Sequence, residues 1–433
     1  MSSERDAPAR DPQQRRILTV LVAAQVLSGA GLAAGITVGA LLAQEMLGGT
    51  ALAGLPTALF TVGSAVAAAA VGRISDTGGR RRGLTVGYTV GAVGALGVVL
   101  AAVLGSPALL FAAFVLYGSG TATNLQARYA GADAAAPQRR ASAVSTVLLA
   151  TTLGGVLGPN LTAISGAAVA PWGVPALAGP FLLAALAYGA AAVVLGLMLR
   201  PDPLLLARER AAAATVSVVA ATVDGPAVAA PEPAQARSAA PSVVVGAVVM
   251  TVTQLVMVAI MTMTPVHLTA HGHGVGIAGM VIAVHVAAMF LPSPITGRLV
   301  DRFGPLRMAA ASGGTLLFAG LLAAIAPADS VPLLTIALAL LGLGWNIGLV
   351  SGTAILAAVP LDVRARTQGK VDVAIALSGA GAGLASGLVV SAAGYSTLAL
   401  AGGVAALVIV PAVAAAPLRR RRAARAATDQ PAV

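Results

Sequence analysis

The feature that most constrains this chain is a series of apolar stretches that recur from one end of it to the other. A stretch of roughly twenty apolar residues crosses a lipid bilayer as a single helix. Hydrophobic residues make up 58% of the 433 residues, and charged residues only 9%. So few charges cannot cover the surface of a soluble protein of this length. We therefore predict an all-α, polytopic membrane protein.

The stretches predict about twelve transmembrane helices. They cover residues 17–43, 51–72, 83–104, 108–128, 142–165, 175–199, 242–266, 275–298, 307–326, 331–356, 371–392 and 396–416. Glycine and proline occur within several of them, which membrane helices tolerate. The first stretch is longer than the core of a signal peptide and many others follow it, so we expect no cleavage.

Basic residues mark one side of the membrane, because all 26 Lys and Arg lie in the termini or in alternate loops. The clusters are Arg15–Arg16, Arg73–Arg82, Arg128–Arg140, Arg200–Arg237, Arg298–Arg307, Arg364–Lys370 and Arg419–Arg425. Cytoplasmic loops are enriched in Lys and Arg, so we predict a cell-membrane protein with both termini cytoplasmic and the loop "TAHGHG" outside. Because the basic residues lie in these loops, the net charge of +11 does not indicate a protein that binds nucleic acid. We expect a monomer in the lipid bilayer.

The chain divides into two halves that resemble each other. The predicted parts are a tail at 1–16, a first half at 17–200, a linker at 201–241, a second half at 242–418 and a basic tail at 419–433. The linker is rich in Ala, Pro and charge, so we expect it to be flexible and cytoplasmic. The sequence "GRISDTGGRRR" at 72–82 recurs as "GRLVDRFGPLR" at 297–307, an offset of 225 residues. Such repeats are typical of secondary transporters, whose substrate path lies between them.

These repeated loops carry a family resemblance. The first copy resembles the loop signature G-x-x-x-D-x-x-G-R-[RK] of the major facilitator superfamily. Its positions are filled by Gly72, Asp76, Gly79, Arg80 and Arg81, and the second copy keeps Gly297, Asp301 and Gly304 but has Pro305 in place of the first arginine. The resemblance implies twelve helices in two pseudo-symmetric halves of six, and transport by alternating access. It leaves the substrate open.

We interpret the first copy as a conformational latch. Gly72 would let two helices approach closely, and Asp76 can cap a helix or pair with Arg80 or Arg81. Gly297 and Asp301 would act in the same way in the second copy. The alternative is that the arginines only orient the protein by their charge.

A second motif lies in the fifth predicted span. The sequence "GGVLGP" at 154–159 is similar to the G-x-x-x-G-P motif of many antiporters, with Gly154, Gly158 and Pro159 at its fixed positions. This resemblance keeps an exporter among the alternatives.

The sequence contains no phosphate-binding G-x-x-x-x-G-K-[ST] loop, which argues against ATP-driven transport. We expect gradient-driven or facilitated transport, no enzymatic activity and no cofactor. Glu45, Arg128 and Asp372 lie near predicted interfaces, where snorkelling or solvation explains them at least as well as function does.

Soft donor atoms gather around spans seven and eight. All four histidines and six of the ten methionines lie between Met250 and Met289. Met257 and Met261 share one helix face, as do His285 and Met289. Thioether and imidazole suit Cu(I), so we predict a metal site of these four residues near the middle of the membrane.

The remaining histidines and methionines are assigned other roles. His267, His271 and His273 would crowd the outer mouth, where copper would be admitted. Met263 and Met280 fall off the shared faces, and we assign them to packing. Each methionine taken alone is also explained as a filler of irregular apolar gaps.

A closer resemblance supports copper. "MVAIM" at 257–261 and "HVAAM" at 285–289 resemble the Met-x-x-x-Met and His-x-x-x-Met signature of the CcoA-like copper importers. It implies copper as the transported substrate, without any resident metal. The alternative is a proton-linked carrier or exporter of a small organic molecule, such as a drug-like compound or riboflavin, which relatives of those importers carry. An organic-cargo carrier should tolerate Met257→Leu, whereas a copper carrier should not.

Overall fold

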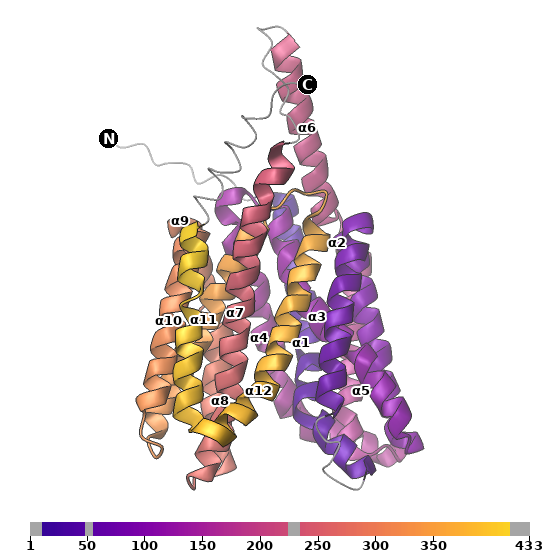
Figure 1. The fold of residues 1–433 in the computed structure, drawn as a ribbon. Helices are drawn as coiled ribbons and strands as arrows, with labels where there is room; N and C mark the ends of the chain where they lie inside the picture. The colour runs from indigo at the N-terminus through magenta and orange to yellow at the C-terminus, as the bar shows by residue number, and fades with distance from the viewer. Residues whose placement is uncertain (1–10, 48–54, 224–233, 416–433) are drawn as a thin grey trace, which may run out of the picture.

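The structure, a computed structural model, describes residues 11–47, 55–223 and 234–415, which form two bundles of helices side by side (Figure 1). No β-strand occurs in these ranges. The helices are α1 (Pro12–Leu47), α2 (Leu55–Leu104), α3 (Pro107–Asp133), α4 (Arg140–Val169), α5 (Gly179–Met198), α6 (Pro203–Val223), α7 (Ala234–Ala270), α8 (Val275–Phe290), α9 (Ser293–Phe303), α10 (Pro305–Ile325), α11 (Val331–Leu356) and α12 (Arg364–Ala406).

Eight helical segments of the described chain are long and apolar enough to cross a membrane. Two of them, Ala58–Leu104 and Arg364–Ala415, each cover most of two consecutive predicted spans. Helices α1 and α4 match the predicted spans at 17–43 and 142–165. The predicted all-α, polytopic fold is therefore confirmed.

Three glycines turn the chain between successive helices. Gly79 has φ 84° and ψ 166°, Gly304 has φ 88° and ψ 148°, and Gly394 has φ 82° and ψ 167°. Residues with a Cβ rarely adopt such a positive φ. Gly79 and Gly304 occupy equivalent positions of the repeated loop, so the internal repeat extends to the backbone conformation.

Each half builds its own hydrophobic cluster. One cluster comes chiefly from α1 to α5, and a larger one comes from α7 to α12 with a few residues of α3 and α4. Large apolar side chains also point outward, as Leu384 does with 76% of its surface exposed. A membrane protein presents such side chains to lipid.

The predicted linker is helical at its start, which corrects the expectation of a flexible segment there. Asp202 caps α6 by accepting hydrogen bonds from the N–H groups of Leu204 at 3.0 Å and Leu205 at 3.2 Å. Its other oxygen accepts the N–H of Arg81 at 2.7 Å, which ties α6 to the turn at Gly79. The segment is rich in alanine, a strong helix former, but the charged residues at 208–210 interrupt it, so no long apolar run marked the helix. Figure 1 shows α6 rising beyond the bundles.

Two other boundaries differ from the prediction. The span expected at 275–298 is divided into α8 and α9, because Pro292 and Pro294 lack the N–H groups that would continue the helix. Helix α7 begins at Ala234, within the predicted linker, and ends at Ala270 rather than at 266. The predicted basic tail at 419–433 and residues 1–10 of the first tail lie outside the described residues.

Candidate functional site between the two halves

The halves meet at one end of the molecule, where glycines let helix backbones cross. A Cβ added to Gly72 on α2 would lie 2.9 Å from Cα of Gly369 on α12. A Cβ added to Gly297 on α9 would lie 2.9 Å from Cα of Ser142 on α4. Neither crossing has room for a side chain. We call the end that holds these crossings the closed end, and the charge pattern predicts that it faces the cytoplasm.

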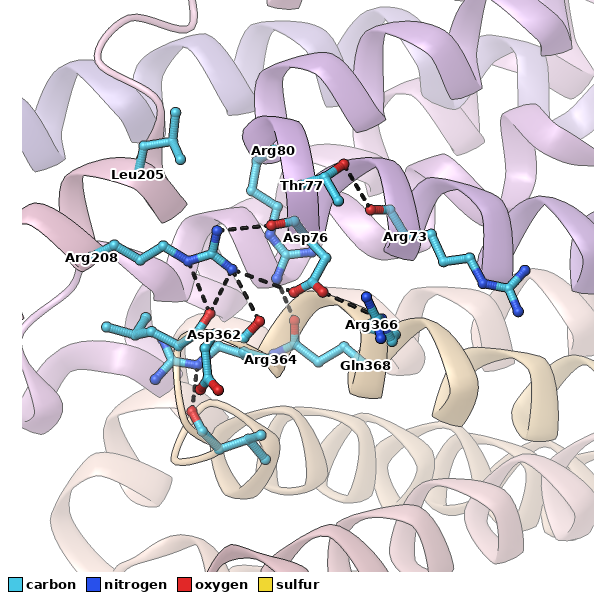
Figure 2. Close-up of polar contacts among 12 residues, drawn as sticks. Arg73, Asp76, Thr77, Arg80, Leu205, Arg208, Asp362, Arg364, Arg366 and Gln368 are labelled. Carbon is cyan, nitrogen blue, oxygen red and sulfur yellow. Dashed lines mark hydrogen bonds and ion pairs between the residues drawn. The ribbon is translucent and has the colours of Figure 1, made fainter. Parts of the chain in front are cut away.

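Asp76 lies at the closed end between α6 and α12 (Figure 2). Its carboxylate pairs with Arg208 of α6 and with Arg366 of α12, each at 3.4 Å. Arg208 also donates to the backbone oxygens of Asp76 and Leu361, both at 2.8 Å. Asp76 and Arg208 therefore tie the first half and the connecting helix to the second half.

Arg80 points into the interior instead of toward Asp76. It is fully buried, its Nε donates to Asp133 at 2.7 Å, and its Nη2 donates to Gln368 of the second half. Arg81 offers its backbone N–H to the aspartate that caps α6. The sequence suggested Arg80 or Arg81 as partners of Asp76, and the structure shows partners from α6 and α12 instead.

Asp301, the counterpart of Asp76 in the second copy, caps α4 of the first half. Its Oδ1 accepts the N–H of Ala141 at 3.0 Å, and its Oδ2 accepts the N–H and the hydroxyl of Ser142 at 2.9 and 2.5 Å. The free N–H groups and the dipole at a helix N-terminus stabilise a carboxylate there. The second copy keeps a tight tie between the halves despite the substitution by Pro305.

A buried ion pair joins the halves deeper in the bundle. Arg128 of α3 donates to Oδ1 of Asp372 of α12 at 2.7 Å, and the hydroxyl of Tyr129 donates to the same oxygen at 3.0 Å. Arg128 is fully buried and Asp372 nearly so. The expectation of solvated or snorkelling groups is wrong for both, because the opposite half covers them. The same expectation of a solvated group agrees with Glu45, which is exposed on α1.

Several residues of this contact carry no motif and were not singled out from the sequence. Asp133 and Gln368 are examples. Gln368 follows Arg364 by four residues on one helix face, and Asp133 follows Arg128 by five. Polar residues placed about one turn from an arginine near the end of a predicted span were the available signal.

The predicted copper ligands lie in the second half, on α7 and α8. Met257 and Met289 are 4% and 8% exposed and belong to one hydrophobic cluster, against which the partly buried Met261 packs. His285 is fully buried, and its Nδ1 bonds to the carbonyl oxygen of Leu338 on α11 at 2.8 Å. Its Nε2 is also buried and has no hydrogen-bond partner among the described residues.

Methionine would be essential to any metal site here. Within the described residues, no group of three or more His, Cys, Asp or Glu side chains is arranged to hold a metal ion. Met280 is half exposed, and Met263 is partly buried and packs against both the cluster of Met257 and a second, small one.

The other three histidines lie at the opposite end of the molecule, here named the histidine end. His267 stacks on Tyr395 of α12, with ring centroids 4.4 Å apart and planes inclined by 15°. The ring of His271 also lies 4.4 Å from that of His267, and its Nδ1 bonds to the His267 carbonyl oxygen at 2.8 Å. His273 is partly buried, with no hydrogen-bond partner for its Nε2 among the described residues.

The helix bounds set the depth of the four donors below the histidine end. With a rise of about 1.5 Å per residue, Met261 lies about 14 Å from the end of α7, and His285 about 15 Å from the start of α8. Met257 and Met289 lie about 20 and 21 Å deep by the same measure. Helices α7 and α8 contact each other. By these helix bounds Met261 lies at the same depth as His285. The shorter span expected from the sequence had placed Met257 at the depth of His285.

The antiporter-like motif lies on α4. Gly154, Gly158 and Pro159 fall within α4, but their side chains lie outside the part of the chain that the structure describes.

Comparisons with known proteins agree with the architecture. The family model of the Major Facilitator Superfamily matches residues 21–347 and 246–432. The uncharacterized MFS-type transporter YdeG of Bacillus subtilis (strain 168) is 53% identical over 400 residues, covering 92% of this chain and 91% of that protein. The riboflavin transporter RfnT of Brucella anthropi is 29% identical over 404 residues, covering 92% and 95%.

A solved structure shows the same fold. The crystal structure of the human organic anion transporter MFSD10 (TETRAN) matches with a TM-score of 0.73 at 17% identity, covering 93% of this chain and 100% of that one. The fold, the repeated loops and the family model agree, and the chain belongs to the major facilitator superfamily as a multi-pass secondary carrier.

Proposed function

We propose that this carrier imports copper, as Cu(I), through a transient site formed by Met257, Met261, His285 and Met289. The His285 ring is the observation on which the proposal rests. Its Nδ1 carries the hydrogen, because it bonds to a carbonyl oxygen, and in the neutral ring Nε2 then keeps a free lone pair. A histidine that binds metal is commonly oriented by such a bond from its other nitrogen.

The chemistry of the donors favours a soft ion that must leave again. Thioether and imidazole ligands suit Cu(I), and a thioether needs no deprotonation to bind. Hard cations such as Mg²⁺ and Ca²⁺ require carboxylates, and α7 and α8 contain none. A buried polar atom without a partner destabilises a fold by roughly 1–3 kcal/mol, so the unpartnered Nε2 calls for a ligand or another explanation.

The donors form two levels along a path from the histidine end. His267 and His271 would receive the ion, Met261 and His285 would hold it next, and Met257 would then share it with Met289. Met261 is the most exposed of the four, which suits the first level inside the membrane. Release would take place after the closed end opens.

Release depends on breaking the ties between the halves. In the described structure the two halves are held together by the Arg128–Asp372 pair and by the Asp301 cap of α4. Alternating access moves one half against the other around the binding site. These ties would have to part before copper left toward the predicted cytoplasmic side.

A small organic molecule is the second candidate. The similarity to the riboflavin transporter RfnT extends over 92% of this chain and favours a cargo of that size. In that case the methionines would only fill gaps between helices, a role for which the side chain is well suited.

Uptake by intact cells separates the two candidates. Cells with and without the gene are given ⁶⁴Cu in one arm and radiolabelled riboflavin in the other. We expect gene-dependent copper uptake that Met257→Leu abolishes and Met263→Leu leaves unchanged. Met263 is the matched control, because it lies on the same helix, receives the same substitution and is partly buried. Gene-dependent riboflavin uptake without copper uptake would replace the copper proposal with the organic one.

A further inference from the structure

A cavity of about 920 Å³ lies at the closed end, beside the contact between the halves. Arginine supplies six of its eight charged lining residues. The charged lining residues are Arg15, Arg139, Arg140, Arg210, Arg298 and Arg364, together with Asp11 and Asp133. We call this cavity the arginine pocket.

The two carboxylates of the arginine pocket are already engaged. Asp11 pairs with Arg210 at 2.6 Å. Burial alone would raise the pKa of Asp11, but the hydrogen bond and charge of Arg210 lower it, so the carboxylate is ionised and neutralises that arginine. Asp133 forms ion pairs with two arginines, Arg80 at 2.7 Å and Arg364 at 3.6 Å.

Four arginines of the pocket are left over. Arg15, Arg139, Arg140 and Arg298 make no ion pair within the described part of the chain. A concave surface lined by one sign of charge focuses its field and concentrates counter-ions. The pocket therefore attracts anions.

Two guanidinium groups have buried nitrogens without a hydrogen-bond acceptor. Arg364 is only 4% exposed, and its Nη1 makes no hydrogen bond within the described residues, because its ion-pair partner Asp133 is 3.6 Å away. The Nε of Arg140 is likewise buried and unpartnered there. Burial lowers the pKa of Arg140, and the charge of Asp133 offsets only part of this. An anion in the pocket would satisfy both groups.

We propose that the arginine pocket binds an anion bearing phosphate groups, and that the bound anion holds the closed end shut. Guanidinium groups bind phosphate oxygens in pairs of parallel hydrogen bonds, and several arginines together favour more than one phosphate. The volume is that of a site for a small molecule rather than for a single ion. The phosphate could belong to a soluble metabolite or to a lipid headgroup, since the chemistry is shared.

The pocket is assembled from both halves, which links binding to conformation. Arg139 and Arg140 lie at the start of α4 in the first half, whereas Arg298 of α9 and Arg364 of α12 belong to the second. Opening the closed end moves these two pairs apart. A ligand that binds one conformation more tightly shifts the population toward it, so the anion favours the closed state and slows transport.

The binding test uses the purified full chain in phosphatidylcholine nanodiscs at about 150 mM salt, where exposed charges are well screened. Inorganic pyrophosphate and ATP are titrated by calorimetry, and cardiolipin binding is followed by native mass spectrometry. The pocket variant is R139Q/R298Q, which changes two exposed side chains. Its control, R82Q/R302Q, removes the same charge from two exposed arginines that do not line the pocket.

We expect pyrophosphate, ATP or cardiolipin to bind the wild type and the control alike, and the pocket variant at least tenfold more weakly. Binding of the soluble probes alone assigns the site to a soluble phosphate compound, and binding of cardiolipin alone assigns it to the bilayer. The proposal is wrong if the wild type binds none of the three, or if the pocket variant binds as well as the control.

The conformational test exploits the absence of cysteine from the chain. Val373 of α12 packs across the halves against a small cluster of alanines that contains Ala122 of α3. The double substitution A122C/V373C should form a disulfide faster when the probe that binds is present, and R139Q/R298Q should remove this acceleration. If the rate of disulfide formation is unchanged when the probe saturates the pocket, the proposal that the anion holds the closed end shut is wrong. Neither test uses a transported substrate, so both are independent of the copper proposal.

Discussion

Arg128 and Thr353 touch each other across the two halves although they occupy equivalent positions of the repeat. Nε of Arg128 donates to Oγ1 of Thr353 at 3.1 Å, and the two residues are 225 apart in the chain. The same offset relates Gly72 to Gly297. Equivalent positions can meet only close to the axis that relates the halves. The Arg128–Asp372 ion pair therefore lies near that axis, where a rocking motion must rearrange it.

We expect Asp372→Asn to shift the protein away from the closed state. The substitution leaves Arg128 buried without a counter-charge, and removing one partner of a buried pair destabilises by on the order of 3–5 kcal/mol. Opening would let water reach Arg128, so the loss should favour opening over unfolding. Disulfide formation in A122C/V373C should slow by roughly tenfold or more. Asp362→Asn, an exposed aspartate at the same end, is the control, and equal rates in both variants would contradict this role.

Gly72→Ala should also disfavour the closed state, for a steric reason. The new Cβ would lie 2.9 Å from the backbone Cα of Gly369, which cannot move aside without separating α2 from α12. Gly78→Ala is the matched control, because its Cβ would meet only the flexible side chain of Arg82. We expect slower disulfide formation between A122C and V373C in the Gly72 variant only. If the disulfide forms at the parent's rate in both variants, the crossing of α2 and α12 accommodates a side chain and the prediction is wrong.

Much of the fold follows from local pattern in the sequence. Apolar stretches of membrane-spanning length specify the helices, and the glycines at 79 and 304 mark equivalent turns, because a positive φ excludes most other residues. The helix α6 was missed because the charged residues at 208–210 interrupt its apolar residues, so no long apolar run marked it. Its cap depends on Asp202, whose second oxygen binds Arg81 more than a hundred residues away in the chain.

The contact between the halves was predictable only in outline. The repeated loops indicated that Asp76 and Asp301 matter, but their partners come from distant segments. Arg366 and Ser142 reach these carboxylates only because the fold brings α12 and α4 beside α2 and α9. An ion pair between residues so far apart leaves no periodic trace in a single sequence.

Asp76→Asn should slow transport a few-fold without weakening substrate binding. Its two ion pairs are long, at 3.4 Å, and both arginines have solvent access, and such pairs contribute about 0–1 kcal/mol each. Asp301→Asn should slow transport more, because this carboxylate accepts three hydrogen bonds at the start of α4. Initial uptake rates and equilibrium binding, measured in parallel, test both. Weakened binding at a normal rate would place Asp76 in the substrate site instead.

The predicted orientation can be tested with single cysteines. Ala270→Cys at the histidine end should react with an impermeant maleimide in intact cells, and Ala214→Cys on α6 should react only after lysis. Both positions are exposed and helical, whereas Gly272 in the adjacent loop has φ 83° and would strain a cysteine. Labelling of Ala214→Cys in intact cells would reverse the topology and place the arginine pocket outside.

The last prediction concerns the copper site. His285→Ala should abolish Cu(I) binding by the purified protein, because imidazole is the strongest of the four donors, and Met257→Leu should weaken it. Met257→Leu keeps nearly the same volume, so it should lower the free energy of unfolding by less than about 1.5 kcal/mol. Competition with a Cu(I) chelator measures affinity, and thermal unfolding checks the fold. If His285→Ala and Met257→Leu both bind Cu(I) as tightly as Met263→Leu, these residues pack the helices and the cargo is another molecule.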